Sequence, residues 1–191
     1  DKDRLDDFQA MIDNPEIKAI ICARGGYGTT RIIDDLDFLP LEKHPRWVIG
    51  FSDITALLFD LYNQGIESVH GIMAGLFYKE NRGESIESLR KVLFDEDIVI
   101  HAPFHPFNRP GEVSGRVIGG NLSIICNLIG TESDIDYENI ILFIEDLDEY
   151  LYHIDRLMVH LKRAGKLEKI KGLIVGDMSD MRDNEIPFGS N

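Results

Sequence analysis

The sequence has few cysteines, an excess of acidic residues and no long hydrophobic run. Its 191 residues include two cysteines, Cys22 and Cys126, each within an apolar segment. We interpret them as buried thiols in a reducing compartment, which favours the cytoplasm over an oxidising location. The sequence contains 20 lysines and arginines and 34 aspartates and glutamates, which gives a formal net charge of −14. Because nucleic acids and anionic membranes bind basic surfaces, we expect neither as a partner.

The length allows one sizeable hydrophobic core or two small ones. No apolar run reaches membrane-spanning length, and the first residues do not resemble a signal peptide. The chain starts at Asp1 inside an apparent helix and stops at 186–191 in an apparent loop. We therefore expect a fragment of a longer protein.

Apolar segments typical of buried strands alternate with helical segments in the first half of the chain. Strands are expected at 17–23, 47–50 and 66–69, and a helix is expected at 53–63. The first strand is expected to lead into a helix that carries Ile32, Ile33 and Leu36 on one side. Such alternation predicts parallel strands with right-handed crossovers, and functional groups at the carboxyl ends of these strands.

A similar pattern follows a change in composition. Residues 101–111 contain three prolines in eleven residues and are interpreted as a connector. Beyond it we expect a strand at 112–118, a Gly-Gly-Asn turn at 119–121, a helix to 128, a strand at 140–144, a helix at 150–164 and a strand at 172–176. The sequence thus predicts an α/β protein with a Rossmann-like parallel-sheet domain over residues 1–100 and a smaller α/β domain over residues 112–191.

The stretch 46–57 reads as a buried strand that turns sharply into a helix. Gly50-Phe51-Ser52-Asp53 forms the turn, which would lift the Ser52 hydroxyl clear of the sheet as in a nucleophile elbow. The amide of Asp53 opens the helix and can face a developing oxyanion. The spacing departs from G-x-S-x-G, because Ile54 replaces the second glycine. The alternative is that Ser52 or Asp53 only caps the helix.

A glycine-rich loop, Gly25-Gly26-Tyr27-Gly28, follows the first predicted strand. Its amides can bind a phosphate or an oxyanion, although it is neither a P-loop nor a dinucleotide-binding fingerprint. A plain tight turn is the alternative. The expected position beside Ser52 favours the oxyanion role, because an oxyanion hole usually takes an amide from a neighbouring loop.

Glu145 and His70 are candidates for the acid and the base. Glu145 ends an apolar strand, where a carboxylate can orient a catalytic histidine, or it belongs to an acidic cluster that precedes a helix. His70 is expected on the strand next to that of Ser52 and is a plausible general base. The alternative is that His70 only packs or caps.

The remaining histidines predict no metal site. His101 and His105 are separated by Pro103, so they do not share a helical face. His153 and His160 lie seven residues apart on one predicted helix and are interpreted as part of an exposed basic stripe. No cofactor is expected.

Together these motifs resemble those of the LD-carboxypeptidase family of serine peptidases, which also contains the microcin C immunity hydrolases. The resemblance covers nearly all of the chain and follows the family's order. The matching stretches are Ala23-Arg24-Gly25-Gly26-Tyr27-Gly28, Ile49-Gly50-Phe51-Ser52-Asp53-Ile54-Thr55, 119–123, 142–146, 152–156 and 172–177. It implies a Rossmann-like N-terminal domain and a smaller C-terminal domain, both incomplete in this chain, and a homodimer.

The resemblance also implies roles for individual residues. Ser52 would be the nucleophile, Glu145 the acid that orients the histidine, and the amides of Gly26 and Asp53 the oxyanion hole, with no metal. The family's histidine lies in a Pro-x-Gly-His-like stretch well downstream of the Glu145 motif, which these 191 residues do not contain. Because loss of one triad member costs about 10⁴- to 10⁶-fold in kcat, we expect the chain alone to be nearly inactive.

The implied reaction is hydrolysis of the amide between an L-centre and a terminal D-amino acid, typically D-alanine of cell-wall muropeptides during recycling. The expected partner is therefore a muropeptide. Two alternatives stay open. One is a microcin C immunity-type hydrolase of acyl-adenylate-like amides, and the other is a non-catalytic binding module of the same fold.

Overall fold

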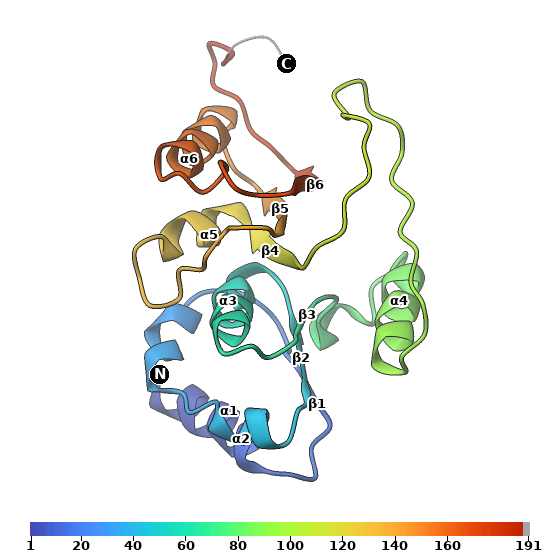
Figure 1. The fold of residues 1–191 in the computed structure, drawn as a ribbon, viewed down its shortest axis with the longest axis vertical. Coiled ribbons are helices and arrows are strands. Elements are labelled where there is room, and N and C mark those ends of the chain that lie inside the picture. The colour runs from blue at the N-terminus through green and yellow to red at the C-terminus, as the bar shows by residue number, and fades with distance from the viewer. Residues whose placement is uncertain (189–191) are drawn as a thin grey trace.

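The computed structural model describes residues 1–188, and in that range the chain forms two parallel three-stranded sheets (Figure 1). The α/β class with parallel sheets is therefore confirmed. Residues 189–191, at the end of the predicted terminal loop, lie outside the described part. The first sheet contains β1 (Ala19–Ile21), β2 (Trp47–Gly50) and β3 (Val69–His70), and the second contains β4 (Val117–Asn121), β5 (Ile141–Leu147) and β6 (Gly172–Ser179), in these orders.

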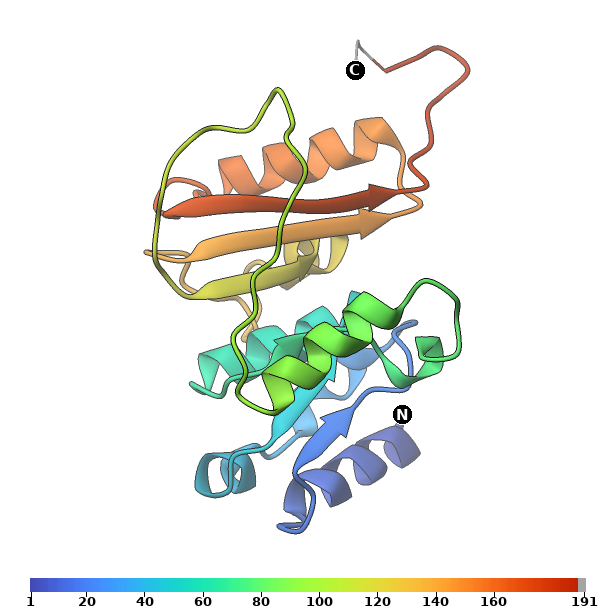
Figure 2. The ribbon, with the colours of Figure 1, turned by 90° about the vertical axis from the view of Figure 1, so that its right-hand side faces the viewer.

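Helices connect successive strands and cover the sheets. Figure 2 shows two of them behind the second sheet, while the segment 94–116, which has no helix or strand, passes in front of it. Within residues 1–188, no helix has both the length and the hydrophobicity to cross a bilayer. The helices are α1 (Lys2–Asp13), α2 (Leu39–Lys43), α3 (Thr55–Asn63), α4 (Gly83–Leu93), α5 (Leu122–Leu128) and α6 (Leu151–Arg163).

Parallel pairing brings the carboxyl ends of neighbouring strands to one edge of each sheet. In the first sheet Ile21 pairs with Ile49, and Gly50 pairs with His70. In the second sheet Asn121 pairs with Glu145. The loops that follow β1, β2 and β3 therefore leave the first sheet side by side, as the alternation of strands and helices predicts.

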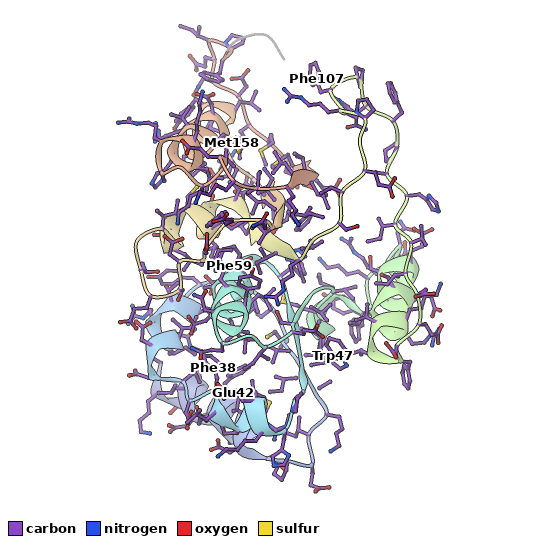
Figure 3. All side chains as sticks on the ribbon, viewed as in Figure 1. Phe38, Glu42, Trp47, Phe59, Phe107 and Met158 are labelled. Carbon is purple, nitrogen blue, oxygen red and sulfur yellow. The ribbon has the colours of Figure 1, made fainter. Side chains whose placement is uncertain are left out.

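Helix α3 belongs to both hydrophobic cores. Leu57, Leu58 and Leu61 pack with the core of the first sheet. Ala56 and Phe59 pack with the core that β4, β5, α5 and α6 form around the second sheet, and Figure 3 shows Phe59 at this junction. Helix α3 is buried against both units. Its first residues, next to Ser52, are therefore held in place relative to both sheets.

The prediction of a helix directly after the first strand is wrong. Two 3₁₀ turns, Thr29–Arg31 and Ile33–Asp35, replace it, and the short helix α2 follows. The segment is rich in β-branched residues and aspartates, which have low helix propensity. The apolar spacing of Ile32, Ile33 and Leu36 resembles a helical face, but it serves a turn that packs Ile33 into the core.

The bounds of every strand except β2 also differ from the expectations: β1 is shorter than 17–23, and β6 continues past residue 176 to Ser179. Strand β4 starts at Val117, not at residue 112, and it includes the glycines that were expected to form a turn. These glycines allow close packing, because a Cβ at Gly119 would lie 1.8 Å from the carbonyl oxygen of Phe143. Strand β3 is reduced to Val69–His70, and β5 continues to Leu147, so Glu145 is a strand residue.

Replacing Gly119 by alanine should lower the free energy of unfolding by about 2 kcal/mol or more, because the added methyl group would collide with the backbone of β5. Urea unfolding followed by circular dichroism measures this change. Gly83→Ala is the matched control. A Cβ at Gly83 meets no atom within 4 Å, and alanine favours the helix by up to about 1 kcal/mol. Equal stability of the two variants would contradict the close packing of β4 on β5.

Candidate active site at the carboxyl edges of the sheets

Ser52 lies at a sharp turn between β2 and α3. The strand ends at Gly50, and a 3₁₀ turn, Ser52–Ile54, leads directly into the helix. Ser52 has a φ of 63°, in the left-handed region that a residue with a side chain rarely adopts. Strain of this kind on a serine between a strand and a helix is the geometry of a nucleophile elbow.

Two glycines make this turn possible. A Cβ at Gly50 would lie 2.7 Å from Cγ2 of Ile54, so only glycine lets the helix fold back onto the strand. A Cβ at Gly25 would lie 2.8 Å from Cβ of Ser52 and 3.0 Å from its Oγ. The glycine-rich loop and the serine, which are separate motifs in the sequence, are therefore in direct contact.

Asp53 ties the same two segments together. Its Oδ2 accepts hydrogen bonds from the amide of Thr29 at 2.9 Å and from the Thr29 hydroxyl at 2.7 Å. The buried carboxylate thus anchors the loop after β1, which is a different role from capping its own helix. The Asp53 amide belongs to the 3₁₀ turn Ser52–Ile54, and the first N–H groups of a helix lack a carbonyl partner within it. The amide of Ile54, the next residue, already donates to the carbonyl oxygen of Phe51. Gly26, the other predicted oxyanion donor, lies in the anchored loop with a φ of 104°.

Glu145 is a half-buried carboxylate on β5, opposite Asn121. Its Oε1 is buried and has no hydrogen-bond partner in the described part of the chain. Burial, and secondly the charge of Asp146, raise the pKa of Glu145 to about 7. A carboxyl group with an open acceptor and a pKa near neutrality is typical of functional sites.

Asp146 is a positioning residue that the sequence did not single out. Its Oδ1 accepts a hydrogen bond from the Asn121 side chain at 2.8 Å, and its Oδ2 accepts from the amide and hydroxyl of Ser123 at 3.0 and 2.8 Å. The backbone N–H of Asn121 in turn donates to Oγ1 of Thr55 at 3.0 Å. This network links β5 to the starts of α5 and α3. Neighbouring side chains on a strand point to opposite faces of the sheet. Asp146 therefore anchors β5 through the face opposite to that of Glu145.

His70 lies between the two sheets. Its ring contacts Phe143 of β5 edge-on, with centroids 5.0 Å apart, and it lies 6.0 Å from the ring of Phe51. Phe143 precedes Glu145 by two residues, so both side chains leave the same face of β5. The Nδ1 atom of His70 is buried without a partner among residues 1–188, and burial lowers the pKa of His70 to about 4. A neutral, packed imidazole of this kind fits the packing alternative better than the role of a base.

The other histidines lie apart from this arrangement. His153 Nδ1 is 2.5 Å from Oε2 of Glu149. His160 lines a surface groove with Arg156 and Arg163, and since all its lining residues lie on or at the end of α6, the groove is not part of the site at the strand ends. Among the residues that the structure describes, no group of three or more histidine, cysteine, aspartate or glutamate side chains is placed to hold a metal ion.

The chain is similar to known proteins over nearly its whole length. Residues 1–71 match the profile of the LD-carboxypeptidase N-terminal domain, and residues 114–190 match that of the LD-carboxypeptidase C-terminal domain. A protein of Bacillus subtilis (strain 168), named as a probable murein peptide carboxypeptidase, is 37% identical over 182 residues, which are 93% of this chain and 57% of that protein. The chain spans about three fifths of the length of the curated relatives it matches.

Solved structures share the fold. The crystal structure of muramoyltetrapeptide carboxypeptidase from Oxalobacter formigenes superposes with a TM-score of 0.83 and 29% identity, over 97% of this chain and 65% of that one. The microcin C7 self-immunity protein MccF in complex with aspartyl sulfamoyl adenosine gives a TM-score of 0.80 and 26% identity, over 94% of this chain and 63% of the MccF chain.

The strain at Ser52 predicts that Ser52→Gly is more stable than Ser52→Ala by about 0.5–1 kcal/mol, because glycine adopts a positive φ without steric cost. Thermal or urea unfolding of the two variants measures the difference. The control position is Ser88, inside α4. There the alanine variant should be more stable than the glycine variant by about 1 kcal/mol. If Ser52→Ala is as stable as Ser52→Gly or more stable, the backbone at position 52 is not strained.

The raised pKa of Glu145 predicts a pH-dependent effect of Glu145→Gln. The folded state holds the Glu145 proton more tightly than the unfolded state, so ionisation of Glu145 destabilises the fold as pH rises from about 4.5 through about 7. Glu145→Gln removes this effect. The variant should match the unsubstituted chain at pH 4 and exceed its unfolding free energy by about 1–2 kcal/mol at pH 8, after allowance for solvent screening. Urea unfolding measures both free energies. A difference between the two proteins that stays the same at pH 4 and pH 8 would contradict the raised pKa of Glu145.

Proposed function

The chain belongs to the LD-carboxypeptidase family, and we propose that the protein carrying it is a serine peptidase that releases a terminal D-amino acid, typically D-alanine, from cell-wall muropeptides. The observation that carries this proposal is the strained Ser52 at the end of β2, with the glycine-rich loop packed against it. The names of the relatives support hydrolysis of a murein peptide. The scissile bond would be the amide between an L-centre and the D-residue.

In the proposed reaction the Ser52 oxygen attacks the carbonyl carbon of the L-centre while its proton passes to a general base, which then serves as the general acid. The oxyanion that forms is stabilised by the amides of Gly26 and Asp53, which the Asp53–Thr29 hydrogen bonds hold in one assembly. Collapse of the tetrahedral intermediate expels the amine of the D-residue with a proton from the general acid. Water then attacks the acyl-enzyme by the reverse route and frees Ser52.

We further propose that Glu145 orients a histidine supplied from outside these 191 residues. The unpartnered Oε1 atom supports this role, because it offers a buried acceptor for an imidazole N–H. The pKa of Glu145 near 7 would fall once a cationic imidazolium lies beside it, and the ionised carboxylate would then stabilise that cation. The same proposal makes the chain alone nearly inactive. Homodimer formation and a cytoplasmic location are proposals that rest on the family resemblance and on cysteine usage.

A second candidate function is supported by the likeness to MccF. That protein was solved with aspartyl sulfamoyl adenosine, an analogue in which an aminoacyl group is linked to a nucleoside. An immunity-type hydrolase would use the same nucleophile and oxyanion hole on an acyl-adenylate-like amide. The substrate, not the nucleophile, therefore separates the two candidates.

The test is release of D-alanine from a tetrapeptide that ends in L-Lys-D-Ala or meso-diaminopimelate-D-Ala. The whole protein should release it, whereas its Ser52→Ala variant and the 191-residue chain should be reduced by about 10⁴-fold or more. Activity of the short chain that His70→Ala abolishes would make His70 the base and contradict the assignment of an external histidine. A whole protein that is silent on both peptides but cleaves an aminoacyl sulfamoyl nucleoside or its amide analogue would favour the immunity-type function. Silence on all substrates would favour a binding module.

A further inference from the structure

The side chain of Arg24 lies beside the proposed oxyanion hole and has no role in the mechanism above. Arg24 directly precedes Gly25, the residue that contacts Ser52. Its guanidinium folds back over Gly26, since a Cβ at Gly26 would lie 3.3 Å from Nη2 and 3.6 Å from Nε of Arg24. A permanent positive charge therefore lies against one of the two proposed oxyanion donors.

This charge is exposed and is not neutralised by a neighbouring carboxylate. Two arginines from nearby segments, Arg4 and Arg31, both pair with Asp1. Among residues 1–188, Arg24 forms no ion pair, although the chain has 34 acidic residues. An uncompensated guanidinium at the edge of a catalytic site is a binding group for an anion in the substrate.

The substrate of the proposed reaction carries an anion at the matching place. In a peptide that ends in a D-residue, a single Cα separates the scissile nitrogen from the terminal carboxylate carbon, a distance of about 2.5 Å. When the scissile carbonyl oxygen is bound at Gly26, the carboxylate of the leaving residue must therefore lie within a few ångströms of that loop. Guanidinium binds carboxylate through two parallel hydrogen bonds, which fixes its orientation as well as its position.

We propose that Arg24 binds the terminal carboxylate of the leaving D-amino acid and so restricts the enzyme to the last residue of the peptide. This inference rests on the proposed function. It assigns carboxypeptidase specificity, as distinct from endopeptidase or esterase activity, to one side chain next to the nucleophile. A substrate whose terminal carboxylate is blocked as an amide would lose this contact while it keeps the scissile bond.

Binding to the whole protein with the Ser52→Ala substitution tests the proposal without turnover. Calorimetry compares a tetrapeptide that ends in D-alanine with the same peptide that ends in D-alaninamide. The free acid should bind about 10- to 100-fold more tightly, the range expected for a hydrogen-bonded ion pair. Adding Arg24→Gln should remove this preference and leave the binding of the amide unchanged, and Arg24→Lys should restore part of it. Arg31→Gln is the matched control and should retain the full preference.

Turnover by the otherwise unsubstituted protein provides the second readout. Arg24→Gln should lower kcat/KM for the free acid by a similar factor, mainly through KM, and should not change kcat/KM for the amide. Equal binding of acid and amide before any change at Arg24, or an equal loss for both peptides in Arg24→Gln, would overturn the proposal and leave Arg24 as a support for the loop. If the acid preference depends on Arg24 but no D-alanine is released, the carboxylate site stands and the proposed peptidase function fails.

Discussion

The burial of helix α3 between two hydrophobic cores is the constraint on which the site depends. Leu57 and Leu61 belong to the core of the first sheet, whereas Phe59 belongs to that of the second. A rotation or shift of the helix would expose apolar side chains of both cores to water. Ser52 at the turn and Thr55 at the first residue of the helix are therefore held relative to both sheets, and the Thr55–Asn121 hydrogen bond extends this hold to β4.

Around this fixed helix, the site departs from arrangements that maximise stability. Ser52 has a strained backbone, and Glu145 and His70 each bury a polar atom that has no partner in the described residues. Strain and unpaired buried polar groups are costly, and proteins tend to retain them where they contribute to function. Buried Arg46, before the first residue of β2, also has unpartnered nitrogen atoms, so such atoms are not confined to one edge. The position of Ser52 and Glu145 near the carboxyl ends of β2 and β5 supports an enzyme over a binding module that only keeps the fold.

The sequence predicted the parallel α/β architecture because buried strands and crossover helices leave clear periodic patterns. It also predicted the sharp strand-to-helix turn at Gly50-Phe51-Ser52-Asp53, because an apolar run precedes these residues and an amphipathic segment follows them. It misread Gly119 and Gly120 as a turn, because a glycine required for close packing on Phe143 and Thr55 looks the same in a sequence as a glycine required for a turn. The role of Asp146 depends on hydrogen bonds to Asn121 and Ser123, which are distant in the chain. The role proposed for Arg24 depends on the contact of its loop with Ser52 through Gly25, and local patterns encode neither arrangement.

The central claim, that Ser52 is an activated nucleophile, is tested most directly by covalent labelling with a fluorophosphonate and mapping of the adduct by peptide mass spectrometry. The account predicts one adduct on Ser52 of the whole protein, its loss in Ser52→Ala, and its retention in Ser123→Ala, whose hydroxyl is bound to Asp146. An adduct on another serine, or a whole protein that releases D-alanine while Ser52 stays unlabelled, would contradict the account.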